Sequence, residues 1–137
     1  MDKALNYLSL ARKGGMAELG EEPVGAITRT GKGYLVVVAG DASDHTWRRA
    51  KSFVAGTSQQ CVRLSCTKEE LGFVVGRTSL AIAAITDAPL ALALVKSLGE
   101  PEKYKDAIAA LDEKVRKLKK RQLEAKAHQR NVRKGKK

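Results

Sequence analysis

Residues 34–43 read YLVVVAGDAS and residues 80–85 read LAIAAI, and these two stretches decide the fold class. Each contains a short, continuous apolar run, which is typical of a strand that is covered on both faces. The first run leads into residues 40–44, a loop of small and cap-forming residues at which a helix can begin. Because a sheet that is buried on both faces needs helices on both sides, the two runs predict an α/β fold.

Helical patterns that end at glycines alternate with these strands along the chain. Helices are predicted over 3–13, 21–30, 46–55, 68–75 and 88–98, a further strand over 61–66, and an extended piece over 16–19. Thr67 and Glu70 have the spacing of a capping box, and Asp87 is placed to cap the last of these helices. This order of elements predicts a three-layer α/β/α sandwich around a small mixed sheet.

The two cysteines, Cys61 and Cys66, lie in the predicted strand QCVRLSC. Five positions apart on one strand, they would point to opposite faces and lie about 16 Å apart along it. Within that strand they could form neither a disulfide nor a shared metal site. We therefore expect two small hydrophobic side chains, buried or half-buried.

Positive charge is concentrated at the C-terminus. The chain of 137 residues has a formal net charge of +11, yet residues 1–100 hold 12 basic and 10 acidic side chains, whereas residues 101–137 hold 14 and 5. We therefore expect a nearly neutral α/β/α domain over 1–99 and a basic C-terminal extension over 100–137, which is helical or partly disordered. Such an extension favours polyanions, nucleic acid above all. Its last stretch has no large apolar residues with which to enter a membrane surface.

Within the extension, an apolar stripe precedes a basic stretch. The stripe consists of Tyr104, Ile108, Leu111, Val115 and Leu118. Its spacing predicts a helix that docks on the domain, with a short self-associating coil as the alternative. From residue 119 onward there are nine basic residues and one acidic residue, which predicts a frayed helix or a disordered arm that orders on its partner. The residues expected to contact RNA phosphates are Lys119, Lys120, Arg121, Lys126, Arg130, Arg133 and Lys134.

Nothing in the sequence defines a catalytic set. His45 follows a helix cap and His128 lies in the basic stretch, and no cysteine–histidine cluster has the spacing of a metal site. We therefore expect no enzyme activity, no cofactor, no metal and no small-molecule substrate. The start of the chain does not have the pattern of a signal peptide, and no apolar run reaches the roughly 18 residues of a membrane span, so we expect a cytoplasmic protein without a membrane partner.

Four stretches together resemble the kink-turn-binding ribosomal protein superfamily, of the L-seven-Ae and L-thirty-e type, and its small bacterial members in particular. They are ALNYLSLARKGG (4–15), GEEPVGAI (20–27), YLVVVAGDAS (34–43) and TKEELGFVVGRTSLAIAAIT (67–86). The resemblance covers about residues 3–97, and its order and spacing are more specific than any single piece. It implies the same α/β/α sandwich and the binding of RNA at kinked junctions between a helix and an internal loop. Ribosomal RNA is then the expected partner, in a ribonucleoprotein that can include ribosomal proteins.

The resemblance also implies three RNA-binding segments. They are the start of the second helix, the loop after the first long strand and the loop before the last strand. The residues that match them are Gly20, Glu21, Glu22, Asp41, Ser43, Gly76, Arg77, Thr78 and Ser79. Amides at a helix start can approach a phosphate, a short carboxylate can accept hydrogen bonds from guanine, and a small apolar loop can cover an unstacked base.

At the second helix the chain departs from the family pattern. The family usually carries Asn-Glu and, three residues later, Lys, where this chain has Glu21, Glu22 and Gly25. The change to Gly removes a phosphate or base contact, and the added carboxylate repels phosphate. Nearby basic residues either compensate or are solvated surface; they are Lys13, Arg29, Lys32 and Arg77. The departure favours an alternative function, a ribosome-associated protein-interaction or scaffold module whose tail binds nucleic acid without specificity.

Overall fold

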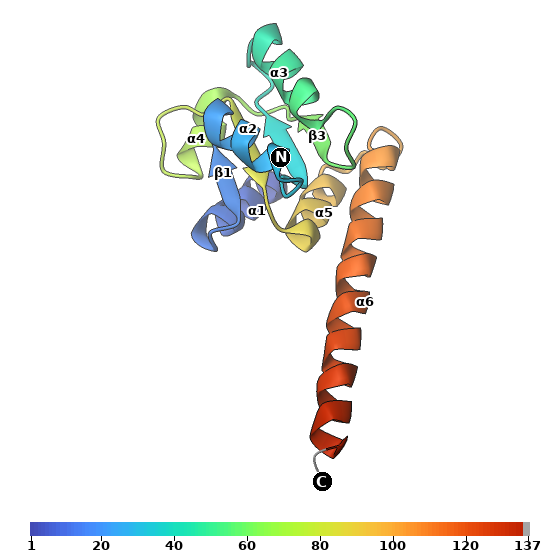
Figure 1. Cartoon of the computed structure of the whole chain (residues 1–137). Coiled ribbons are helices and arrows are strands. Elements are labelled where there is room, and N and C mark those ends of the chain that lie inside the picture. Colours follow the sequence, from blue (N-terminus) through green and yellow to red (C-terminus); the bar gives the residue numbers. More distant parts are fainter. Residues whose placement is uncertain (136–137) are drawn as a thin grey trace.

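Six helices and four strands follow one another in the part of the chain that the structure, a computed structural model, describes: backbone for residues 1–135 and side chains for residues 1–129. The elements are α1 (Asp2–Lys13), β1 (Ala17–Leu19), α2 (Glu21–Arg29), β2 (Leu35–Val38), α3 (Asp44–Val54), β3 (Gln60–Arg63), α4 (Lys68–Phe73), β4 (Ile82–Ile85), α5 (Ala88–Ser97) and α6 (Lys105–Gly135). Figure 1 shows how they are arranged.

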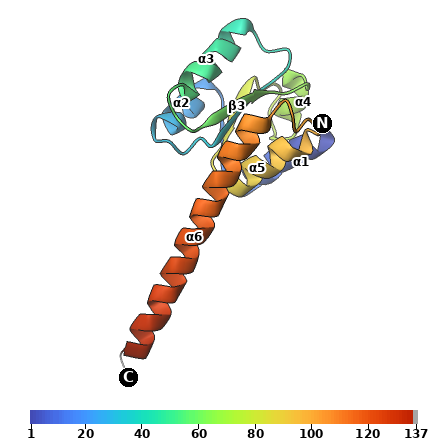
Figure 2. The same cartoon turned by 90° about the vertical axis from the view of Figure 1, so that its right-hand side faces the viewer.

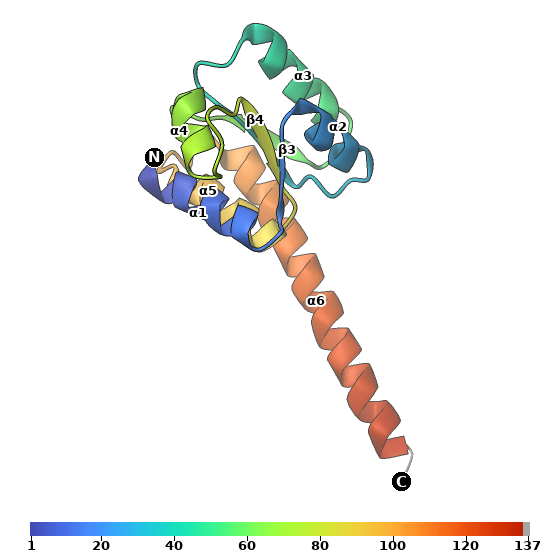
Figure 3. The ribbon, with the colours of Figure 1, turned by 90° about the vertical axis from the view of Figure 1, so that its left-hand side faces the viewer.

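The sheet is mixed, as predicted. Its strand order is β1-β4-β2-β3, with β2 parallel to β3 and β4 antiparallel to both of its neighbours. Every residue of β2 and of β4 is buried, which confirms that both apolar runs are covered on two faces. Helices α2 and α3 cover one face, and α1 and α5 cover the other, so that the three predicted layers are present (Figures 2 and 3).

The predicted helix caps are confirmed. Thr67 and Glu70 form a complete capping box at the start of α4, and Asp87 accepts a hydrogen bond from the Leu90 amide at the start of α5. Helix α3 begins at Asp44, two residues before the predicted start, because Ser43 acts as its N-cap and accepts a hydrogen bond from the Thr46 amide.

Strand β3 is shorter than predicted and ends at Arg63 rather than at residue 66. The chain beyond it stays beside the loop that follows β2, because Leu64 N donates to Val38 O over 2.8 Å and Gly40 N donates to Cys66 O over 2.8 Å. A Cβ atom at Gly40 would lie 2.5 Å from the Leu64 carbonyl oxygen, so this close crossing requires glycine. Cys66 therefore lies outside the strand, and the argument from opposite strand faces does not apply to it.

The burial predicted for both cysteines is confirmed, since Cys66 is buried and Cys61 is half-buried. Burial raises the pKa of each thiol above the ordinary value, and the carboxylates of Glu70 and Asp41 raise the pKa of Cys66 further. Because the thiolate is the reactive form, we expect both side chains to react slowly with iodoacetamide in the folded protein. Alkylation followed by mass spectrometry, with urea-unfolded protein as the control, measures this. Equal rates in the folded and unfolded protein would contradict the expectation.

Helix α6 docks through the predicted stripe. Leu111 and Val115 are buried in the core, as is Ala107, and Tyr104, Ile108 and Leu118 are partly buried against it. Beyond this docked part the helix continues to Gly135 and projects from the body (Figure 1), where the sequence predicted a frayed helix or a disordered arm. The residues of this stretch are mostly good helix formers, which accounts for its continuation. Within residues 1–135, no helix has the combination of length and apolar character that a membrane span needs.

Candidate nucleic-acid interface

The three predicted RNA-binding segments meet at one end of the sheet. Leu19 pairs with Ala83, and Val38 pairs with both Ile82 and Arg63. These pairs bring the ends of β1, β2 and β3 beside the start of β4. The connection between α5 and α6 lines a hollow at this same end together with Gly40 and Asp41. We call this end the loop end. It consists of residues 20–22, 39–44, 64–69, 76–81 and 98–104.

The start of α2 and the loop before β4 lie against each other. Gly20 precedes α2 with φ of 94°, a conformation that favours glycine, and its amide donates to the Ile82 carbonyl oxygen over 3.0 Å. A Cβ atom at Gly20 would lie 3.8 Å from Nη1 of Arg77. The Arg77 guanidinium, which belongs to an exposed residue, therefore lies beside the helix start that the resemblance assigns to RNA.

The loop at residues 76–79 is held in place by backbone packing against α4. Arg77 N donates to Gly72 O over 2.9 Å, and a Cβ atom at Gly72 would lie 2.8 Å from both Arg77 O and Ser79 N. Only glycine fits this position without a shift of the loop. Thr78 and Ser79 are exposed, so the loop offers two hydroxyl groups and one guanidinium on a fixed backbone.

Two of the predicted contact residues take part in holding the loop end together. Asp41 Oδ1 accepts a hydrogen bond of 2.8 Å from the Lys68 amide at the start of α4. Ser43 Oγ accepts from the Thr46 amide over 3.2 Å and lies 3.1 Å from the Thr46 hydroxyl. Both residues are exposed, but part of their hydrogen-bonding capacity is used within the protein.

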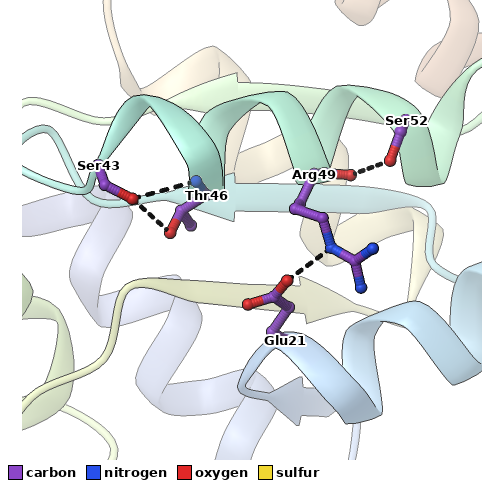
Figure 4. A network of polar contacts seen from close by, with 5 residues as sticks. All are labelled: Glu21, Ser43, Thr46, Arg49 and Ser52. Carbon is purple, nitrogen blue, oxygen red and sulfur yellow. Dashed lines mark hydrogen bonds and ion pairs between the residues drawn. The ribbon is translucent and has the colours of Figure 1, made fainter.

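Glu21 is engaged by a neighbouring helix. Figure 4 shows Arg49 reaching from α3 to the start of α2, where its Nε donates to Glu21 Oε1 over 2.6 Å. The two side chains are 48% and 41% exposed, so the ion pair contributes at most about 1 kcal/mol to stability. Glu22 is exposed, and its side chain makes no hydrogen bond or ion pair with residues 1–129.

Gly25 lies beneath an aromatic ring. A Cβ atom there would lie 3.1 Å from the edge of the Phe53 ring, and the guanidinium of Arg49 lies 5.0 Å from the centre of the same ring. The Cβ atom of a lysine at position 25, which the family that the sequence resembles usually carries, would require the Phe53 ring to shift by a few tenths of an ångström. This helix start therefore carries a cluster of Glu21, Gly25, Arg49 and Phe53 in place of the pattern of the family that the sequence resembles.

The loop end is acidic on balance, with seven acidic and three basic residues in its five segments. The opposite end of the sheet, which we call the turn end, consists of residues 12–16, 29–34, 55–59 and 86–87. The register places it where β1, β2 and β3 begin and β4 ends. Lys13 and Lys32 lie at the turn end and Arg29 lies in the last turn of α2, so the expectation that they lie near the start of α2 was wrong. Lys13, Arg29 and Lys32 are close to the start of α2 in the sequence, but β1 and α2 each run from one end of the sheet to the other, which separates these residues in space.

The basic arm, which we define as residues 119–135 of α6, is exposed wherever its side chains are described. Lys119, Lys120, Arg121 and Lys126 belong to this part. Arg130, Arg133 and Lys134 lie on the same helix, and their side chains are outside the described residues. The docked half of α6 differs, because Arg116 pairs with Asp112 and Lys117 pairs with Glu113.

Sequence reasoning missed Arg49, Phe53 and Gly72. Arg49 and Phe53 were placed on a helix, but each contacts a residue of α2 that lies 28 positions earlier in the sequence. Gly72 stands in the middle of an apolar helical pattern, where glycine is costly, and this was the one available signal for a close backbone approach. Among the described residues, no group of His, Cys, Asp and Glu side chains could hold a metal ion.

Many solved structures have a similar fold, and two of them are compared with this chain. One is a protein of unknown function from Bacillus halodurans, with 23% identity and a TM-score of 0.66, and the similarity covers 72% of this chain and 98% of that one. The other is the 15.5kD RNA binding protein of Giardia lamblia, with 18% identity and a TM-score of 0.60, and it covers 74% of this chain and 86% of that one. No family model and no curated protein matches this chain. The fold is thus one that an RNA-binding protein also has.

Proposed function

We propose that this chain is a cytoplasmic RNA-binding protein of ribosomal type, which recognises a bent junction in a folded RNA, ribosomal RNA in the first place, without catalysis. The observation that carries the proposal is the convergence at the loop end of the three segments that the resemblance assigns to RNA. The overall charge of +11 and the fold shared with an RNA-binding protein of Giardia lamblia support it.

The proposed contacts divide between recognition and attraction. At the loop end, the Gly20 and Glu21 backbone, the Arg77 guanidinium and the Thr78 and Ser79 hydroxyls face a folded RNA element. The basic arm adds phosphate contacts that carry no sequence information. The Glu21–Arg49 pair and the position of Phe53 over Gly25 mean that the kinked junction is held without the lysine that the family usually provides.

Crosslinking in living cells tests this function. The chain is crosslinked to RNA by ultraviolet light, and the crosslinked positions are mapped by sequencing. We expect a cluster at one bent junction of ribosomal RNA. Crosslinks scattered evenly over cellular transcripts would contradict recognition, and an absence of crosslinked RNA would contradict RNA binding.

A second candidate function is a protein-interaction module on the ribosome. The acidic balance of the loop end favours it, because this surface repels phosphate and suits a basic partner protein. Purification from cells after treatment with nuclease distinguishes the two. Retention of a ribosomal protein, with no protected RNA fragment, would support the module.

Arg77→Ala tests recognition at the loop end. The guanidinium lies beside Gly20, so its loss should weaken binding to the preferred RNA by about 1–3 kcal/mol and binding to a plain duplex by less. Titration of both RNAs with each protein measures the difference. Lys51→Ala in the last turn of α3 is a control that removes one exposed charge away from the loop end. An equal loss on both RNAs would make Arg77 a phosphate contact only.

A further inference from the structure

The turn end carries the opposite charge balance to the loop end. Its four segments hold four basic residues and one acidic residue. The acidic residue is Asp87, whose carboxylate accepts the Leu90 amide as the cap of α5. The basic side chains are exposed and form no ion pair within the described residues; they are Arg12, Lys13, Arg29 and Lys32.

Helix α6 carries its basic arm away from the loop end. It begins just after the hollow at that end, to which Lys103 and Tyr104 contribute, and it packs along α5 and β3. At about 1.5 Å per residue its 31 residues span about 46 Å, which far exceeds the body's short strands. The arm consequently leaves the body on the side of the turn end, and Figures 1, 2 and 3 show it pointing away from the rest of the molecule.

Among the described side chains, the basic residues of the arm and of the turn end form no ion pair, and the arm leaves the body on the side of the turn end. The carboxylates of α6 that form ion pairs, Asp112 and Glu113, lie in its docked half. The arm holds a single acidic residue, Glu124. A surface of this kind suits phosphates, which are bound by charge with little dependence on sequence.

We propose that the turn end and the basic arm form a second RNA-contacting surface, so that one molecule joins two separate segments of folded RNA. The proposal rests on the proposed function, in which the loop end holds the first segment. An RNA that is held only at the loop end cannot also lie along the arm unless it passes around the body. The partner that fits is therefore a large folded RNA, or two RNAs brought together.

A capture experiment tests this inference. A biotinylated RNA stem with a kinked internal loop is immobilised, the full chain is bound to it, and a fluorescent perfect duplex of about 16 base pairs, a length that presents two successive minor grooves, is added. The test variant carries Lys13→Gln, Lys32→Gln, Lys119→Gln and Lys120→Gln. The control variant carries Arg116→Gln and Lys117→Gln, which remove paired charges from the same helix.

We expect the full chain to capture the duplex, the control variant to capture nearly as much, and the test variant to capture about tenfold less while it still binds the immobilised RNA. Competition between the two RNAs for the same chain would overturn the inference. Equal capture of the duplex by the test variant and by the full chain would also overturn it, because a dimer that binds one RNA at each of its two loop ends would give that result. If the full chain binds the immobilised RNA but captures no duplex, this inference is overturned and the proposed function is not. Failure of the full chain to bind either RNA would overturn the proposed function with it.

Discussion

Replacement of Lys119, Lys120, Arg121 and Lys126 by Gln is expected to lower the salt dependence of RNA binding sharply. If each residue contacts one phosphate, the slope of log K against log salt should fall by about 3 units for single-stranded RNA and by nearer 4 units for a duplex. Over a fourfold increase in salt, the RNA affinity of the full chain should therefore fall about 50-fold or more further than the affinity of the variant. Affinity measured by fluorescence anisotropy at several salt concentrations gives the slope.

The preference among RNAs should survive this change. The arm lies away from the loop end, so it contributes affinity and not recognition. A control on the same helix is Arg116→Gln with Lys117→Gln, which removes two charges that are already paired within α6. Loss of preference together with an unchanged slope would refute this division between the two parts of the molecule.

Gly72→Ala should have the largest effect on stability and should also disturb the RNA-binding loop. The new Cβ atom would lie 2.8 Å from Arg77 O and Ser79 N, which are backbone atoms that cannot turn aside. We expect a loss of about 1–3 kcal/mol in the free energy of unfolding, despite the better helix propensity of alanine. Urea unfolding followed by circular dichroism measures it.

Gly14→Ala is the matched control for this substitution. Its Cβ atom would meet the Met16 Cε atom at 2.7 Å, a similar distance, but this is the end of a flexible side chain. Its φ of −83° also suits alanine. We expect a change within about 0.5 kcal/mol. If both variants unfold at the same urea concentration, the packing of residues 77–79 on α4 does not hold the loop.

The elements of the fold could be predicted because their signals are local. Each signal lies within about fifteen consecutive residues. These signals are the buried runs in β2 and β4, the capping box of α4 and the apolar stripe of α6. The early end of β3 could not be predicted, because it depends on Gly40 crossing the chain at Leu64. A position of this kind is decided by contacts between strands, not by the residues of the strand itself.

The three segments of the site could be predicted from the sequence, but the side-chain contacts that hold them in place could not. Residues 20–22, 41–44 and 76–79 were identified, and the register brings them to one end. The hydrogen bond from the Lys68 amide to Asp41 joins residues 27 apart, and the Arg49–Glu21 pair joins residues 28 apart. The sequence alone also does not show that the nearly balanced charge of residues 1–100 is separated into an acidic and a basic end, because that separation follows from the connections that the strand directions bring to each end of the sheet.

The helical geometry of the arm has one more consequence. At about 100° per residue, Lys119, Lys120 and Arg121 point in three directions around the helix axis, and Lys126 lies within about 20° of Lys119. Three of the four described basic residues of the arm, Lys119, Lys120 and Lys126, thus fall within a sector of about 120° around the axis, and Arg121 lies about 100° beyond it, past Glu124. A polyanion therefore meets most of this positive charge from one side of the helix, and the docked half of α6 fixes which side that is and how far from the body the contact occurs.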